Sequence, residues 1–309
     1  MSATERGPSQ LALFAPGPNG TFAPLLGGLG PLGPASSLDL ARAWYRRELE
    51  QANRPRNTIE SYCYDLTVLE KLVGPKAIDT IDRADIARYL GEANGRSTRK
   101  RRLTSARRFF RFLIDDARVL GSDPTEGYYP HAIPLRSPEP LFAAEQEALL
   151  TAAADDEVWS LPAIWLMLRL GLARSELLAL RLGHIDLAAP AQPVVYVFYD
   201  DASKHGKERK LAADAAFAAI YAAYLDVKSP IDALFPYGAQ AVNGMVDRVR
   251  RAAELSKEVT PLTLRHTFAV DRARAGADED DLLALLGLAD DPRNRASVRR
   301  YLKLAEPPL

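Results

Sequence analysis

Cysteine, histidine and long apolar runs are scarce in this sequence of 309 residues. Its one cysteine, Cys63, excludes an internal disulfide and a metal cluster held by several cysteines. Only four histidines are present, which argues against a histidine-rich metal site. No run of about 18 consecutive apolar residues occurs, and residues 1–8 lack the pattern of a signal peptide. We therefore expect a soluble cytoplasmic protein with no metal and no membrane-spanning segment.

The formal net charge is zero, because 40 lysines and arginines balance 40 aspartates and glutamates. This balance excludes a polycation that binds nucleic acid over its whole surface, but it leaves room for a locally basic face. Hydrophobic residues make up 47% and charged residues 26%, which is the composition of a folded protein. The length suits two domains of ordinary size.

Residues 1–37 carry few charges and many residues that interrupt regular structure. Glycine and proline occupy 13 of these 37 positions, and Glu5 and Arg6 are the only charged residues. Stretches such as 27–31 are not expected to hold a helix or a strand. We predict a disordered tail over residues 1–37, with weak attachment to a partner through its leucines and phenylalanines as the alternative.

Helical periodicity begins at Leu38. Apolar residues at three- and four-residue spacing predict a helix from Leu38, a second capped by Asn57, a third over 83–90 and a fourth over about 97–117. Residues 121–140 include seven glycines and prolines, which indicates a linker. We place an all-helical domain at 38–130 and the linker at 131–139.

The residue pattern changes once in the second half. Helices are predicted over 143–153, 158–168 and 174–182, and then the β-branched and aromatic residues 194–199 predict a strand. A turn-rich tip at 200–206 leads to a return strand at 209–211. Helices resume over 214–225, 240–253, 263–275, 280–286 and 295–302. The expected fold class is mainly α with a small β-sheet, with a second, mixed domain at 140–309.

The fourth helix of the first half is strongly basic. Its apolar stripe includes Leu103, Phe109 and Leu113, and only Asp115 and Asp116 oppose its positive charge. A face of one sign on a neutral protein indicates phosphate contacts, because lysine and arginine displace counterions from DNA. We predict that the DNA-binding residues are Arg96, Arg99, Lys100, Arg101, Arg102, Arg107, Arg108 and Arg111.

Four segments of the second half resemble, in order, the motifs of the tyrosine recombinases, the family of phage integrases. The segments are Gly171–Leu180 for the first catalytic box, Ser203–Arg209 for the β-hairpin lysine, Thr260–Ala269 for the second box, and Leu285–Leu288 followed by Tyr301 for the third box and the nucleophile. The first half resembles the helical, SAM-like core-binding domain of the same family. The resemblance covers about residues 38–303, and four boxes in order are a specific signal.

The resemblance implies a two-domain clamp on duplex DNA and a metal-free, cofactor-free reaction. Tyr301 is the implied nucleophile, which forms a 3′-phosphotyrosine. Arg265 would stabilise negative charge on the phosphate, Lys204 would protonate the departing 5′ oxygen, and Glu176 would support its neighbours. His266, next to Arg265, is expected in the core or behind the site.

Three positions depart from the family pattern. Ala173 stands where the family's first arginine is expected, and Leu262 and Leu288 stand at the two histidine positions. None of these side chains donates a hydrogen bond. Arg174 should point elsewhere, because one helical step turns a side chain by about 100°. The gap of 13 residues from Leu288 to Tyr301 is also longer than the family pattern leads us to expect.

These departures favour a DNA-binding protein on a recombinase scaffold, with strand cleavage lost or strongly reduced, acting at the nucleoid. The first alternative is an active site-specific recombinase, with Arg169 or a neighbouring protomer supplying a donor. The second is a protein-interaction module whose basic face meets an acidic partner. The eight residues after Tyr301 hold two prolines and three leucines, so we expect a monomer or weak dimer without DNA.

Overall fold

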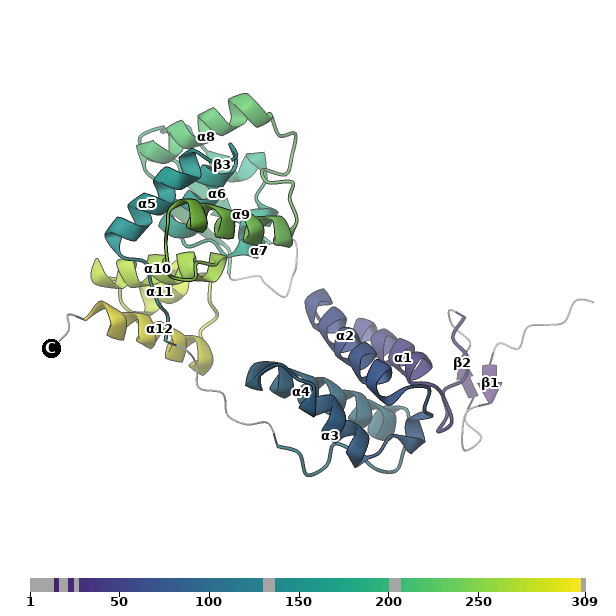
Figure 1. Cartoon of the computed structure of the whole chain (residues 1–309). Coiled ribbons are helices and arrows are strands. Elements are labelled where there is room, and N and C mark those ends of the chain that lie inside the picture. The colour runs from purple at the N-terminus through teal and green to yellow at the C-terminus, as the bar shows by residue number, and fades with distance from the viewer. Residues whose placement is uncertain (1–13, 17–21, 25–27, 130–136, 200–206, 307–309) are drawn as a thin grey trace, which may run out of the picture. The chain divides into compact units, whose positions relative to one another are not determined.

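A computed structural model describes residues 14–16, 22–24, 28–129, 137–199 and 207–306. The chain divides into two compact units, residues 1–135 and 136–309 (Figure 1). The described parts of both units are mostly helical, and a three-stranded sheet lies in the second. The predicted fold class, mainly α with a small β-sheet, is confirmed. Among the described residues, no helix combines the length and the apolar character needed to cross a bilayer.

Four α-helices build the described part of the first unit: α1 (Leu38–Gln51), α2 (Arg56–Val73), α3 (Arg83–Gly91) and α4 (Arg96–Arg111). A π-helical turn, Phe112–Asp116, extends α4. The core is fully buried at Leu66, Tyr89 and Phe109. The prediction that Asn57 caps the second helix is wrong. Pro55 holds the cap position, because its fixed φ and missing N–H suit a helix start.

The structure departs from the predicted disordered tail in the described part of residues 1–37. Two short strands, β1 (Phe14–Pro16) and β2 (Phe22–Pro24), pair in antiparallel register. Further along, the side chain of Leu32 is buried in the helical core, and the Trp44 indole donates to the Gly30 carbonyl at 2.9 Å. These contacts hold residues 30–32 on the helical unit, although their composition favours no regular structure.

Residues 121–129, which end the predicted helical domain at 38–130, pack on the first unit despite their glycines and prolines. Thr125 is fully buried, and the Tyr128 hydroxyl donates to the Arg83 carbonyl at 3.0 Å. Arg107 in turn donates to the Tyr128 carbonyl. Residues 121–129 are therefore part of the helical unit, and residues 130–136 lie outside the described residues.

Helix α6 (Ser160–Arg169) is the centre of the second unit. Ala163, Ile164 and Leu166 are fully buried, because helices pack around α6 on several sides. The surrounding helices are α5 (Ala143–Ala154), α7 (Arg174–Ala179), α8 (Ala215–Lys228), α9 (Ala239–Ala252) and α10 (Pro261–Arg274). A second cluster joins α10 to α11 (Glu279–Leu285) and α12 (Pro292–Ala305). This arrangement brings the predicted second and third boxes side by side.

The small sheet has the strand order β3-β4-β5 and is antiparallel throughout. Its strands are β3 (Ile185–Asp186), β4 (Val194–Val197) and β5 (Arg209–Ala212), with Tyr196 opposite Lys210. Strand β3 was not predicted, because two residues are too few to show a period of two. Strand β4 is also shorter than predicted, and Tyr199 lies beyond its end.

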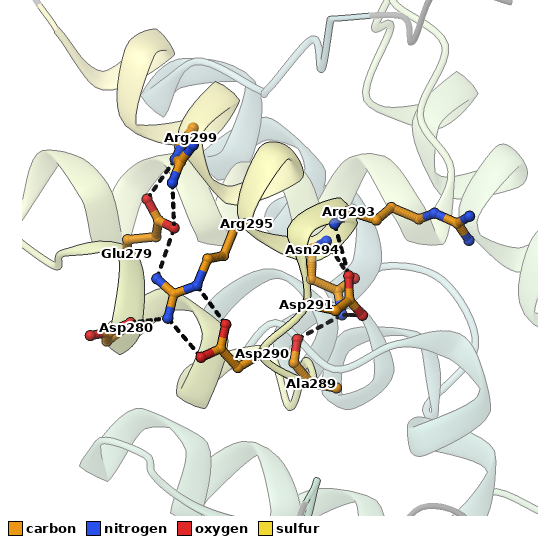
Figure 2. Close-up of polar contacts among 9 residues, drawn as sticks. All are labelled: Glu279, Asp280, Ala289, Asp290, Asp291, Arg293, Asn294, Arg295 and Arg299. Atoms are coloured by element: carbon orange, nitrogen blue, oxygen red, sulfur yellow. Dashed lines mark hydrogen bonds and ion pairs between the residues drawn. The ribbon is translucent and has the colours of Figure 1, made fainter.

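Figure 2 shows what the long segment between Leu288 and Tyr301 builds. Arg295 of α12 pairs with Glu279 and Asp280 of α11, at 2.9 and 3.1 Å, and with Asp290 of the connecting turn. Arg299 reaches the same Glu279 at 2.9 Å. The extra residues therefore form a turn that ties the helix of Tyr301 to α11.

Candidate functional site

A single buried carboxylate organises the predicted site residues of the second unit. Glu176 lies in the first turn of α7, and its side chain is 5% exposed. It accepts hydrogen bonds from the Ala173 amide at 2.7 Å and from the Tyr199 hydroxyl. Arg209 binds both its oxygens, at 3.0 and 2.9 Å, and Arg265 donates to Oε2 at 3.0 Å. Residues from α7, β5 and α10 thus meet at one group.

The arginine pair keeps this carboxylate ionised. Burial alone would raise the pKa of Glu176, but the hydrogen bonds from Arg209 and the charges of both arginines outweigh burial and hold the pKa at about 2. Burial and the contact with Glu176 raise the pKa of Tyr199 to about 12. At neutral pH, Glu176 is therefore an acceptor that fixes arginine side chains, and it has no proton to donate.

Arg265, from the first turns of α10, is held by three elements. Its Nη1 donates to the Gly171 carbonyl at 2.6 Å as well as to Glu176, and its Nη2 donates to the Leu286 carbonyl. Gly171 has a φ of +67°, and a Cβ there would lie 2.2 Å from the ring of Phe268. Only glycine fits that turn. The glycine that begins the predicted first box therefore lets its backbone reach Arg265.

Tyr301 lies on α12 and is 8% exposed. Its ring packs 5.5 Å, between centroids, from the ring of His266 on α10. Burial raises the pKa of the Tyr301 phenol, against the opposing charges of Arg265 and Arg300. Burial first, and then the same two charges, lowers the pKa of His266 to about 4, so its imidazole is neutral at pH 7.

The three departing positions lie around this cluster. Ala173 is the N-cap residue of α7 and offers only its backbone amide, which binds Glu176. The Leu262 side chain is 58% exposed, and Leu288 packs against the cluster of α10, α11 and α12. Nη1 of Arg174 donates to the Asn243 side chain at 2.7 Å. Arg174 points away from Glu176, as expected.

Arg169 does not reach the site. Its guanidinium binds the side chains of Gln146 and Glu147, at 2.9 and 2.8 Å. The expectation that Arg169 compensates for Ala173 therefore finds no support in its contacts. Lys204 lies outside the described residues.

Neither Arg209 nor Tyr199 was predicted as a site residue. Arg209 was placed in a return strand and at the end of the hairpin lysine segment, and Tyr199 at the end of a strand. One signal was available for Arg209: alternate residues of a strand share a face, and Leu211, two positions on, is an apolar residue that is buried. No signal in the sequence places Tyr199 at Glu176.

The basic helix α4 divides into inward and outward cations. Arg101 binds the fully buried Asp65 at 2.6 Å, Arg102 donates to the Tyr89 carbonyl at 3.0 Å, and Arg107 donates to the Tyr128 carbonyl. The predicted DNA-binding residues with exposed side chains are Arg96, Arg99, Lys100, Arg108 and Arg111. The basic face of α4 that is available to DNA therefore has fewer cations than the sequence predicts.

A shallow hollow of about 240 Å³ lies along α4. Its lining is basic and partly apolar: Leu103, Thr104, Arg107, Arg108 and Arg111. The described residues contain no group of three or more histidine, cysteine, aspartate or glutamate side chains placed to hold a metal. The chemistry that these sites offer is the binding of anions by guanidinium groups.

Comparisons with known proteins agree with this geometry. Residues 140–306 match the model of the phage integrase family, and residues 43–116 match its N-terminal SAM-like domain. The chain is 31% identical to the tyrosine recombinase XerD of Ralstonia nicotianae over 84% of its own length and 89% of that protein. It is 27% identical to a tyrosine recombinase of Thermosipho africanus, over 81% and 89% of the two chains.

Solved structures share the fold at lower identity. A lambda integrase dimer bound to a core site matches with a TM-score of 0.68 and 16% identity, over 86% of this chain and 77% of that one. The Tn1549 transposon integrase in complex with a circular intermediate DNA matches with a TM-score of 0.66 and 20% identity, over 86% and 94%. The fold, the order of the motifs and the family models lead to one conclusion: this chain belongs to the phage integrase family of tyrosine recombinases.

Proposed function

We propose that this protein binds duplex DNA as a tyrosine recombinase whose strand cleavage is strongly reduced. The observation that carries the proposal is a half-complete site. Arg265 is held by Glu176 and Tyr301 packs against the ring of His266, while the side chains of Ala173, Leu262 and Leu288 supply no donor to a phosphate. Loss of one preorganised donor to a developing oxyanion lowers a rate by roughly a hundred- to a thousandfold. Three losses within one site need not multiply.

Duplex DNA is the partner that the basic helix suits. The exposed cations Lys100, Arg108 and Arg111 lie on one side of α4, since positions three, eight and eleven residues apart share a helix face. The lambda and Tn1549 integrases with the same fold are bound to DNA in their structures. We assign DNA binding to both domains, at 38–130 and at 140–309.

A suicide substrate tests the cleavage part of the proposal. A nicked duplex that traps the 3′-phosphotyrosine is incubated with the natural protein and with Tyr301→Phe as the control. We expect slow, Tyr301-dependent adduct formation. Efficient cleavage by the natural sequence would contradict the proposal in favour of an active recombinase.

A fully active recombinase is the second candidate. One observation favours it: Nε–H and one Nη2 hydrogen of Arg265 have no partner among the described residues, so this arginine is able to bind a phosphate. The adduct rate separates the two candidates. Competition by duplex DNA, measured against an acidic polypeptide, tests the protein-interaction alternative.

A further inference from the structure

Two guanidinium groups, those of Arg209 and Arg265, share the buried carboxylate of Glu176, and only Arg265 was predicted as a site residue. We propose that Arg209 is a positioning residue of the strand-cleavage site. Its guanidinium group binds both oxygens of Glu176 and thereby leaves one edge of the Arg265 guanidinium available to the scissile phosphate. This inference rests on the proposed function, because it assigns Arg209 a role in the reaction of the same site.

The contacts of Arg209 leave it little capacity for a ligand of its own. Its side chain is 7% exposed. Its Nε donates to the Leu285 carbonyl at 2.8 Å, and Nη1 and Nη2 donate to the two oxygens of Glu176. Nη1 also lies 3.4 Å from the Lys207 carbonyl. A guanidinium has five N–H groups, so Arg209 spends nearly all of them inside the protein.

Arg265 is committed less completely. Nη1 uses both hydrogens, on Gly171 and Glu176, and Nη2 uses one on Leu286. Nε–H and the second Nη2 hydrogen have no partner among the described residues. A phosphate accepts two such hydrogens from one arginine. Arg209 therefore holds Glu176, whereas Arg265 keeps two N–H groups for a phosphate.

Charge gives the physical reason for this division. Glu176 and Arg265 alone would form a neutral pair, and the buried carboxylate would compete with DNA for the remaining N–H groups of Arg265. With Arg209 present, the three side chains carry a net charge of +1. A net positive charge next to the phosphate stabilises the negative charge that develops there.

The glycine of the third box, Gly287, leaves the space that the Arg209 side chain fills. Gly287 has a φ of +58°, and a Cβ there would lie 2.5 Å from Nη1 of Arg209 and 2.9 Å from the Lys207 carbonyl. The carbonyls of Leu285 and Leu286, at the C-terminal end of α11, accept from Arg209 and Arg265 respectively. Carbonyls at a helix end lack partners in the helix and favour cations. Helix α11 thus holds both guanidinium groups side by side.

The test compares Arg209→Met, Arg209→Lys and the double variant Arg209→Met/Glu176→Gln in the full chain. The probe is a suicide duplex with a 5′-bridging sulfur, whose departure needs no proton, so the assay isolates the phosphate-binding part of the site. Single-turnover adduct rates are measured at saturating DNA.

We expect Arg209→Met to lower the rate at least tenfold with duplex affinity unchanged, and Arg209→Lys to fall in between. Removing the carboxylate charge should then restore part of the rate in the double variant. A purely structural role predicts the opposite, a double variant at least as slow as Arg209→Met. That result, or a rate for Arg209→Met within twofold of the natural protein, overturns the proposal.

A second measurement needs no cleavage at all. Nitrogen-15 spectra of the arginine side chains report hydrogen exchange at Nε of Arg265. In Arg209→Met, Glu176 should capture this group and slow its exchange severalfold. Unchanged exchange in a folded variant contradicts the inference. If the natural protein forms no adduct and binds no DNA, the proposed function fails, while this measurement still decides the role of Arg209.

Discussion

His266 is a neutral imidazole packed against the ring of Tyr301, and its titration should be visible in the stability of the protein. Its pKa is about 4 in the folded chain, below the ordinary value of 6.5. Between these values the unfolded chain binds a proton that the folded chain does not, so the free energy of unfolding falls as pH decreases from 6.5 to 4.

We predict that His266→Gln removes this part of the pH dependence, on the order of 2 kcal/mol. Chemical denaturation of both proteins from pH 7.5 to 4.5 gives the difference. Glu176 does not interfere in this window. Its pKa is lowered from 4.5 to about 2 on folding, so its contribution to stability is lost only as the pH falls below about 4.5. Parallel stability curves for the two proteins would show that His266 does not titrate as assigned.

Leu262 is the departing position at which a donor is easiest to restore. Its side chain is 58% exposed, so Leu262→His opens no cavity in the core. We predict that this single change raises the rate of Tyr301 adduct formation about tenfold or more, and that adding Ala173→Arg and Leu288→His raises it further. The control is Leu262→His/Tyr301→Phe, which should form no adduct. A rate unaffected by all three changes would mean that the site is not placed for cleavage.

At the scale of single elements, α4 separates cations that hold the fold from cations available to DNA. We predict that Lys100→Glu, Arg108→Glu and Arg111→Glu together weaken duplex binding at least a hundredfold at low salt. If each residue meets one phosphate, the slope of log affinity against log salt should fall by about 2.7. Filter binding at several salt concentrations measures both quantities.

The matched control makes the same change of net charge in the second unit, at the exposed residues Lys228, Arg251 and Arg274. It should bind DNA with a smaller loss. Arg101 is excluded from the test, because Arg101→Glu would face the fully buried Asp65 and unfold the unit. Equal losses in the two triple variants would show that the loss of affinity is not specific to α4 and would contradict a DNA-binding face on this helix.

Arg295 adds ion pairs to the packing of α12 on α11. We predict that Arg295→Ala speeds amide hydrogen exchange along α12 severalfold but changes the global free energy of unfolding by less than about 1 kcal/mol, because exposed ion pairs contribute little. Arg293→Ala is the control, since the Arg293 side chain is exposed and points away from the acidic groups (Figure 2). Equally slow exchange in both variants would show that the ion pairs of Arg295 do not hold α12 on α11.

At the scale of the whole molecule, the two units have separate hydrophobic cores. We predict two calorimetric unfolding transitions. Phe109→Ala removes a fully buried ring that packs against Tyr45 and Phe110, at a cost of about 3–5 kcal/mol. Only one transition should move to lower temperature. A single transition that shifts as a whole would show that the units unfold together.

The sequence by itself determined the helices, the strand pair and the order of the motifs. Helical spacing of apolar residues is a local property, and α5, α9 and α10 begin and end within two residues of their predicted bounds. Boundaries failed where the start signal was ambiguous, as at Asn57, and β3 was too short to show a pattern. Residues 28–37 are held by contacts such as that of Trp44 with the Gly30 carbonyl, which no local composition reveals.

Only the tertiary structure decided which side chains meet. Glu176, Arg209 and Arg265 are far apart in sequence, and their hydrogen bonds depend on how β5, α7 and α10 pack. The same holds for the pKa of Glu176, because burial raises it and the arginines of distant segments lower it. On α4 the sequence shows a row of arginines, but the buried Asp65 turns Arg101 inward. Periodicity fixes elements because it acts within a few residues, whereas a site is fixed by packing between elements, and packing decides which charges are shared and which remain for a ligand.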